Sequence, residues 1–255
     1  MAFAAEQCDA AAMERDASES AAMETNILFG WLVHLLTAAG AVLAFMALLA
    51  IQDQEWRLAL IWLMAALAID SVDGTLARRL RVKARVPGID GETLDLIVDY
   101  QNYVFVPTVL IWRADLVPAA LALPLAALIQ ISALYDFSRT DLKSEDNYFR
   151  GFPALWNVVA FYLFVTQPGQ TVGAIAIFAL AALTFAPVHF VHPFRVRDYG
   201  AWLPGLAIAW AVATGALLWP DWSAAARTFW LAASAVTAVL LLTLGFLRTI
   251  RGRRA

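Results

Sequence analysis

Long apolar stretches separated by short polar segments dominate the pattern along this chain. A helix needs about 20 apolar residues to cross a bilayer, and eight stretches reach or approach that length. They run over 28–50, 56–72, 93–112, 116–135, 152–167, 170–190, 201–219 and 227–248. The pattern therefore predicts an all-α, polytopic integral membrane protein with about eight transmembrane helices.

The segment 1–24 before the first span is alanine-rich and acidic. It lacks the basic start and apolar middle of a signal peptide. We expect a short cytoplasmic lead, partly helical or disordered, with Met13 and Met23 as alternative starts. Residues 25–255 then form a single transmembrane domain.

Composition supports a membrane protein, because 62% of the residues are hydrophobic and only 15% are charged. A soluble domain usually carries about a quarter charged residues. With both termini in the cytoplasm, all of the 18 Lys and Arg residues except Arg57, Arg113 and Arg227 lie on the inside, as the positive-inside rule requires. The single cysteine, Cys8, excludes an intrachain disulfide and a cysteine-built metal site.

Two pairs of aspartates lie at the ends of the second and third apolar stretches. Asp70 and Asp73 are three residues apart and Asp95 and Asp99 are four apart, so each pair shares one face of a helix. Converging carboxylates repel one another, and an isolated one costs at least about 2.5 kcal/mol at the centre of a membrane helix. Oxygen ligands favour a hard cation, so the four acids predict a site for Mg²⁺ or Mn²⁺, with enough ligands for two ions.

Residues between the pairs suit an anionic ligand. Gly74 lets a ligand approach the backbone, Ala77 keeps the same face open, and Arg78 offers a forked donor to phosphate oxygens. Gly91 lets the chain enter the third helix without crowding. Any one Asp near an Arg is more often a solvated helix end or an ion pair than a site. The occurrence of all eight residues in this order along the chain argues against that interpretation.

The motifs DSVDGTLAR and GETLDLIVD resemble the signature of the CDP-alcohol phosphotransferases, D-x2-D-G-x2-A-R followed by G-x3-D-x3-D. Twelve residues separate Arg78 from Gly91, where most of the family has eight or nine. Alignment on Gly88 instead would place Glu92 at an aspartate position and leave Asp95 and Asp99 unmatched, so Gly91 is the better match.

A long spacer, eight predicted spans in place of a six-helix core, and the segments WLVHLLTAAGAV and RGFPALWNVVAFYLF resemble the bacterial phosphatidylcholine synthase branch. This resemblance implies a catalytic domain in the bacterial inner membrane whose active site faces the cytoplasm. The implied reaction transfers the phosphatidyl group of CDP-diacylglycerol to choline and releases CMP. It also implies a homodimer through the third and fourth helices; no nucleic acid is expected as a partner.

The resemblance implies roles for single residues. Asp70, Asp73 and Asp95 would hold two metal ions, and Asp99 would share the second ion and act as the base for the choline hydroxyl. The nucleotide would lie against Asp70, Gly74, Ala77 and Arg78.

Choline carries a quaternary ammonium, which aromatic faces bind. Tyr103 lies four residues beyond Asp99, and Trp156 lies near the same membrane face. These two are the candidates for the choline site, ahead of Tyr100, Tyr135 and Tyr148. The competing interpretation is an ordinary aromatic belt at the interface.

Three further polar features have weaker interpretations. His34, with Thr37 one turn on, is expected to be a buried hydrogen-bonding residue. The mixed charges from Asp136 to Arg150 are expected to form a solvated loop. His189 and His192, with Arg195 and Arg197, either steady an anionic headgroup or only set topology.

Two alternatives remain open from the residues. Serine, glycerol 3-phosphate or an inositol phosphate could replace choline, although a phosphorylated acceptor calls for a denser basic pocket than the later helices offer. A cation or proton transporter would also use membrane acids, but it leaves Gly74, Ala77 and Arg78 unexplained.

Overall fold

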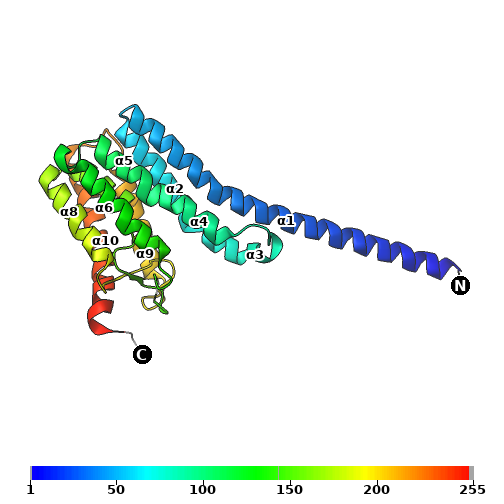
Figure 1. Ribbon diagram of the computed structural model, residues 1–255. Helices are drawn as coiled ribbons and strands as arrows, with labels where there is room; N and C mark the ends of the chain where they lie inside the picture. The colour runs from blue at the N-terminus through cyan, green and yellow to red at the C-terminus, as the bar shows by residue number, and fades with distance from the viewer. Residues whose placement is uncertain (1, 143, 253–255) are drawn as a thin grey trace.

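The computed structural model describes residues 2–142 and 144–252, with side chains described from residue 27 onward. The side chains of the predicted lead 1–24, including Cys8, and the whole of Lys143 lie outside this part. Helices form nearly all of the regular structure (Figure 1). In chain order the elements are α1 (Ala2–Gln52), α2 (Trp56–Arg79), α3 (Val82–Arg85), α4 (Gly91–Asp99), the π-helix η1 (Tyr100–Phe105), α5 (Val106–Arg113), α6 (Ala119–Ser138), β1 (Phe149–Arg150), α7 (Trp156–Thr166), α8 (Gln170–Thr184), β2 (His189–Phe190), α9 (Trp202–Ala216) and α10 (Ala224–Arg251).

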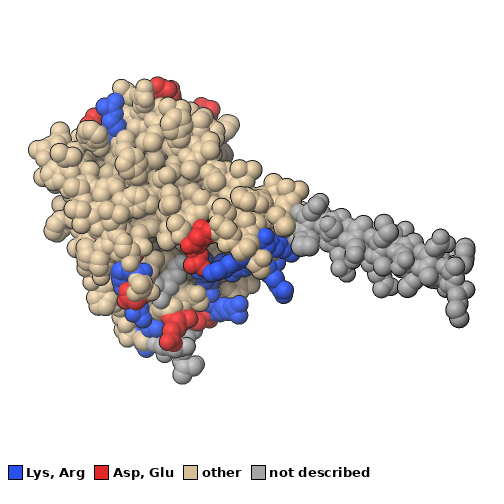
Figure 2. Space-filling view, turned by 45° about the vertical axis from the view of Figure 1, so that its right-hand side comes forward, with Lys and Arg blue, Asp and Glu red and all other residues tan. Residues whose placement is uncertain are grey.

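The helices are those of a membrane protein. In the described chain, four segments are long and apolar enough to cross a bilayer: Ile27–Gln52, Trp56–Arg79, Ala119–Ser138 and Ala224–Arg251. Helices α7, α8 and α9 are apolar but shorter, and α4, η1 and α5 follow one another without a break. In Figure 2 a broad band without acidic or basic side chains separates charges at two ends of the molecule.

The boundaries differ from the predicted spans where glycine or proline interrupts an apolar run. The fifth helix begins at Trp156 rather than near 152, because Ala154, which follows Pro153, has a φ of +48° and so lies outside the right-handed helical region. The sixth ends at Thr184 rather than near 190, just before Pro187, because proline disfavours a helical conformation in the residue before it. The second helix extends to Arg79, beyond the predicted end at 72, so Asp70 and Asp73 lie within its helical turns.

Helix α1 packs against both α2 and α4, and the three lie side by side in Figure 1. Glycines on α1 make the approach close. A Cβ atom at Gly40 would lie 2.6 Å from Val98 Cγ1, and one at Gly30 would lie 2.6 Å from Val86 Cγ2. Small residues at these positions let the neighbouring backbones come near, as in other membrane helix pairs.

Buried hydroxyls attach the C-terminal helices to the rest of the bundle. Ser234 on α10 lies 2.9 Å from the Thr214 hydroxyl on α9 and 2.7 Å from the Tyr162 hydroxyl on α7. Trp210 Nε1 on α9 donates to the same tyrosine oxygen at 2.9 Å. This network satisfies polar groups that lipid could not satisfy.

The described residues of the loops 139–142, 144–151 and 186–200 make specific contacts, which corrects the expectation of a merely solvated charged loop. Strands β1 and β2 pair antiparallel, with Phe149 opposite Phe190 and Arg150 opposite His189. Arg248 of α10 donates a 2.6 Å hydrogen bond to Asp146, and each of these side chains is only 13% exposed. Tyr148 is fully buried and donates to Asp198 at 3.0 Å. The short sheet is an exception to the all-α expectation.

Candidate functional site: an acidic pocket between three helices

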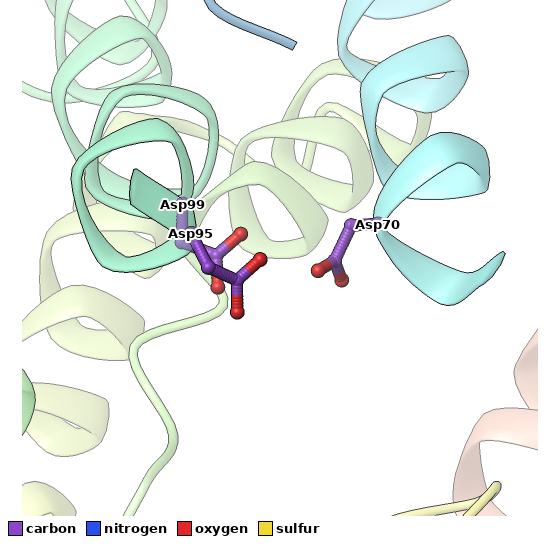
Figure 3. A group of neighbouring side chains, drawn as sticks. All are labelled: Asp70, Asp95 and Asp99. Atoms are coloured by element: carbon purple, nitrogen blue, oxygen red, sulfur yellow. The ribbon is translucent and has the colours of Figure 1, made fainter. Parts of the chain in front are cut away.

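Aspartates from α2 and α4 face each other across one small pocket. Asp70 projects from α2, while Asp95 and Asp99 project from successive turns of α4 (Figure 3). One carboxylate oxygen of each lies within 4.8 Å of the others, and all three side chains are half-buried. The predicted convergence of the two pairs is therefore present for these three residues.

Asp73 lines the same pocket from a more buried position. Its side chain is only 3% exposed, and its Oδ2 accepts a 2.7 Å hydrogen bond from the Thr37 hydroxyl. Its Oδ1 is buried and has no hydrogen-bond partner within the described part of the chain. A buried carboxylate oxygen without a donor is costly, so Asp73 Oδ1 indicates a missing cationic or hydrogen-bonding partner.

Tyr103 closes another side of the pocket. The Tyr103 hydroxyl donates a 2.6 Å hydrogen bond to Asp70 Oδ2. This bond joins two elements, because Tyr103 lies on η1 and Asp70 lies on α2. The neighbouring Asn102 donates to the backbone oxygens of Gly40 and Val98, each at 3.0 Å. The π-helical turn thus connects α4 to both α1 and α2 beside the acids.

The donor set of the pocket fits a divalent cation. All candidate ligand atoms are carboxylate oxygens, and neither His nor Cys joins the group among the described residues. Such oxygens suit Mg²⁺ or Mn²⁺ better than softer metals. The unpartnered Asp73 Oδ1 supports this fit independently of the three clustered acids.

The predicted nucleotide-binding residues follow the acids along α2. Arg78 is exposed and donates to the Thr75 hydroxyl at 3.1 Å. A Cβ atom at Gly74 would lie 3.4 Å from Arg78 Nη1, so the bare glycine leaves room beside the guanidinium. Ala77 is half-buried. These residues lie about one to two turns beyond Asp70 on the same helix, and Gly74 directly follows Asp73.

The start of α4 supports the match on Gly91. A Cβ atom there would lie 3.0 Å from His34 Cε1 on α1, tighter than ordinary contacts. Asp90 is the N-cap and accepts hydrogen bonds from the backbone of Glu92 and Thr93. Hydrogen bonds from the Thr93 side chain and these backbone groups hold the pKa of Asp90 below its usual value.

Trp156 lies elsewhere. It is fully buried in the hydrophobic core, with its ring centroid 5.1 Å from that of Phe152. Its Nε1 has no hydrogen-bond partner among the described residues. It is not among the residues that line the acidic pocket. The structure therefore brings Tyr103, but not Trp156, to the acids.

Sequence reasoning gave no role in this site to Thr37 or Asn102. Thr37 donates to Asp73, and Asn102 attaches η1 to α1. The available signal was the row His34, Thr37 and Gly40, spaced every three residues within an apolar helix. Residues at this spacing lie on one helix face, and buried polar residues in membrane helices usually have a partner.

Comparison with known proteins gives consistent results. The model of the CDP-alcohol phosphatidyltransferase family matches residues 31–186, which include all four aspartates. A phosphatidylcholine synthase of Pseudomonas aeruginosa is 43% identical over 188 residues, covering 74% of this chain and 79% of that protein. One of Bradyrhizobium diazoefficiens is 44% identical over 181 residues, covering 71% and 67%. One of Mesorhizobium japonicum is 42% identical over 164 residues, covering 64% of this chain and 61% of that protein. The resemblance predicted from the two motifs is thereby confirmed.

Proposed function

The chain belongs to the CDP-alcohol phosphatidyltransferase family, and from that premise we propose that it transfers the phosphatidyl group of CDP-diacylglycerol to choline. The products are phosphatidylcholine and CMP. The observation that supports this most is the acidic pocket, in which three carboxylates converge and a fourth keeps one oxygen without a partner among the described residues. Choline is chosen as the acceptor because these relatives are phosphatidylcholine synthases.

In this reaction the choline oxygen forms a bond to the phosphorus that carries diacylglycerol. The bond from that phosphorus to the bridging oxygen of CMP breaks, and CMP leaves with the electron pair. Asp99 accepts the proton of the choline hydroxyl. Its position supports this role, because it is half-buried and adjoins the pocket that the other acids line. A general base must lie within hydrogen-bond reach of the proton it removes.

Asp70, Asp73, Asp95 and Asp99 are the proposed ligands of Mg²⁺ or Mn²⁺. Bound divalent ions would neutralise the pyrophosphate and the departing phosphate of CMP. Gly74, Ala77 and Arg78, together with Asp70, position the nucleotide, and the exposed Arg78 guanidinium is suited to phosphate oxygens.

Tyr103 is the aromatic residue with the best support for choline binding, because its side chain lines the pocket and contacts Asp70. A tyrosine ring attracts a quaternary ammonium. Trp156 has no comparable support from its buried position.

The finer membrane arrangement is also a proposal. Counting the unbroken run 91–113 and the three shorter helices as spans gives eight crossings, with the pocket and both termini on the cytoplasmic side of the bacterial inner membrane. The protein would act as a homodimer formed through the third and fourth of these spans. The distribution of Lys and Arg supports the orientation.

The test uses purified protein in detergent–lipid micelles with CDP-diacylglycerol, Mn²⁺ and labelled choline. Serine and glycerol 3-phosphate serve as rival acceptors, and EDTA removes the metal. We expect choline-dependent release of CMP, label in the lipid fraction, and loss of both with EDTA. Release of CMP only with a rival acceptor would contradict choline as the substrate, and no release with any acceptor would contradict the reaction.

A further inference from the structure

We propose that Thr37 is a positioning residue that orients Asp73 for metal binding. The inference rests on the proposed metal-dependent function and assigns a part of it to helix α1, which carries none of the four acids. Its basis is the 2.7 Å hydrogen bond from the Thr37 hydroxyl to Asp73 Oδ2. Both residues line the acidic pocket.

The hydrogen bond distinguishes the two oxygens of Asp73. Oδ2 is held by Thr37, whereas Oδ1 is buried and unpartnered among the described residues. Fixing one oxygen of a carboxylate fixes the direction of the other, and outer-shell hydrogen bonds commonly orient metal ligands in this way. Thr37 therefore presents Oδ1 as the ligand atom.

The part of α1 that carries Thr37 contacts neighbouring elements on both sides of the threonine. His34, three residues earlier, packs against Gly91 at the start of α4. The carbonyl of Gly40, three residues later, accepts a hydrogen bond from Asn102 at 3.0 Å. One face of α1 thus contacts α4 before Thr37 and η1 after it. The hydrogen bond from the Thr37 hydroxyl connects the Asp73 side chain of α2 to this face of α1.

A single neutral hydroxyl cannot compensate a buried carboxylate. Asp73 is only 3% exposed, and one hydrogen bond from a neutral donor contributes far less than the desolvation of an ion. The unpartnered Oδ1 therefore favours a cation at this oxygen, and the role of Thr37 is to direct the oxygen toward it. This division of tasks predicts an effect on metal affinity rather than on the chemical step.

The test compares Thr37→Val, which keeps the shape and removes the hydroxyl, with Thr37→Ser, which keeps the hydroxyl. Thr184→Val is the matched control, because Thr184 is also buried but, among the described residues, its hydroxyl bonds only to a carbonyl of its own helix α8. Mn²⁺ binding is measured without substrate from the electron paramagnetic resonance signal of free Mn²⁺. The Mn²⁺ dependence of CMP release is the second readout.

We expect Thr37→Val to weaken Mn²⁺ binding about tenfold or more, as loss of other outer-shell partners does. Its turnover should recover largely at saturating Mn²⁺, while Thr37→Ser and Thr184→Val stay near wild type. Gel filtration and thermal unfolding report folding; if Thr37→Val does not fold, Thr37→Ala provides the same comparison without the extra methyl group.

Three results would overturn the inference, and they are distinguishable. Unchanged Mn²⁺ binding in Thr37→Val, with a wild type that binds, would contradict the role of Thr37 alone. Equal impairment of Thr37→Ser and Thr37→Val would show that packing, not the hydroxyl, matters. A wild type that binds no Mn²⁺ would contradict the metal-dependent function together with this inference.

Discussion

The hydroxyl of Tyr103 lies 2.6 Å from Asp70 Oδ2 and donates a hydrogen bond to it across the gap between η1 and α2. The same side chain therefore has two separable features, a donor for a proposed metal ligand and an aromatic face for a cation. Substitutions can remove them one at a time.

Tyr103→Phe keeps the ring and removes the donor, whereas Tyr103→Ala removes both. We expect the phenylalanine variant to retain nearly the wild-type KM for choline. The alanine variant should raise that KM about fivefold or more, because a cation–π contact contributes roughly 1 kcal/mol, and should affect the KM for CDP-diacylglycerol less. Steady-state kinetics with each substrate varied in turn measures this. Equal rises in both KM values would indicate a structural role for the ring.

Asp99→Asn should reduce turnover by about a hundredfold or more, the usual contribution of a general base. The amide has nearly the same shape but cannot accept the choline proton. Binding of CDP-diacylglycerol, followed by equilibrium binding of a labelled analogue, should persist. Substantial residual turnover would remove Asp99 from the role of base, and Glu92→Gln serves as a control because Glu92 is an exposed acid on the same helix.

Gly40→Ala should destabilise the packing of α1 on α4. The new Cβ would lie 2.6 Å from Val98 Cγ1, and a valine in a helix has little freedom to rotate away. Overpacking of this kind costs roughly 1–3 kcal/mol, measured as a lower midpoint of thermal unfolding in detergent. Gly205→Ala is the matched control, because no atom of the described residues lies within 4 Å of its new Cβ. Equal midpoints for the two variants would refute the steric argument.

The Asp146–Arg248 contact should make stability depend on pH. Burial raises the pKa of Asp146, but hydrogen bonds from Arg248 and Ser144 outweigh this effect and leave the pKa below its usual value. A lowered folded-state pKa stabilises the fold above the unfolded pKa of about 3.9, and this contribution is lost as the pH falls through the folded value.

Asp146→Asn should therefore lower the free energy of unfolding at pH 7 by roughly 2 kcal/mol, a typical value for a hydrogen bond to a charged group. The difference from wild type should shrink as the pH falls below about 4, where protonation weakens the wild-type contact as well. Thermal unfolding over a pH series measures this, with Asp141→Asn as an exposed control whose side chain is 56% accessible. A constant difference across the series would contradict the assignment.

The pairing of acids within each helix was predictable because spacing along a helix determines which residues share a face. Asp95 and Asp99 needed only the helical period, and the two motifs indicated that Asp70 would meet them. Contacts between different helices were harder to predict from the sequence. Nothing local to Thr37 specifies Asp73 as its partner, because that contact depends on how closely α1 and α2 pack.

The charged segment from Asp136 to Arg150 shows a second limit of prediction from the sequence. Its composition is that of a solvated segment, yet Tyr148 is fully buried and Asp146 meets Arg248 from a helix about a hundred residues away in sequence. Likewise, Gly151 lies against the backbone of Thr184 at the end of α8, a contact that the composition of the loop does not indicate. Long-range partners of this kind decide whether a polar segment is ordered.

The π-helical turn at Tyr100–Phe105 changes the angular phase of the third membrane segment. Its wider turn, closed by bonds from residue i to i+5, buries both Asn102 and Tyr103 although they are adjacent, so that one reaches α1 and the other α2. The segment after it, α5, is thereby set at a different rotation from α4. Deleting one residue here would restore an ordinary helical phase and turn the whole of α5 relative to Asp95 and Asp99. The π-helical turn contains one residue more than an α-helical turn. This additional residue sets the packing face of α5 relative to the face of α4 that carries Asp95 and Asp99.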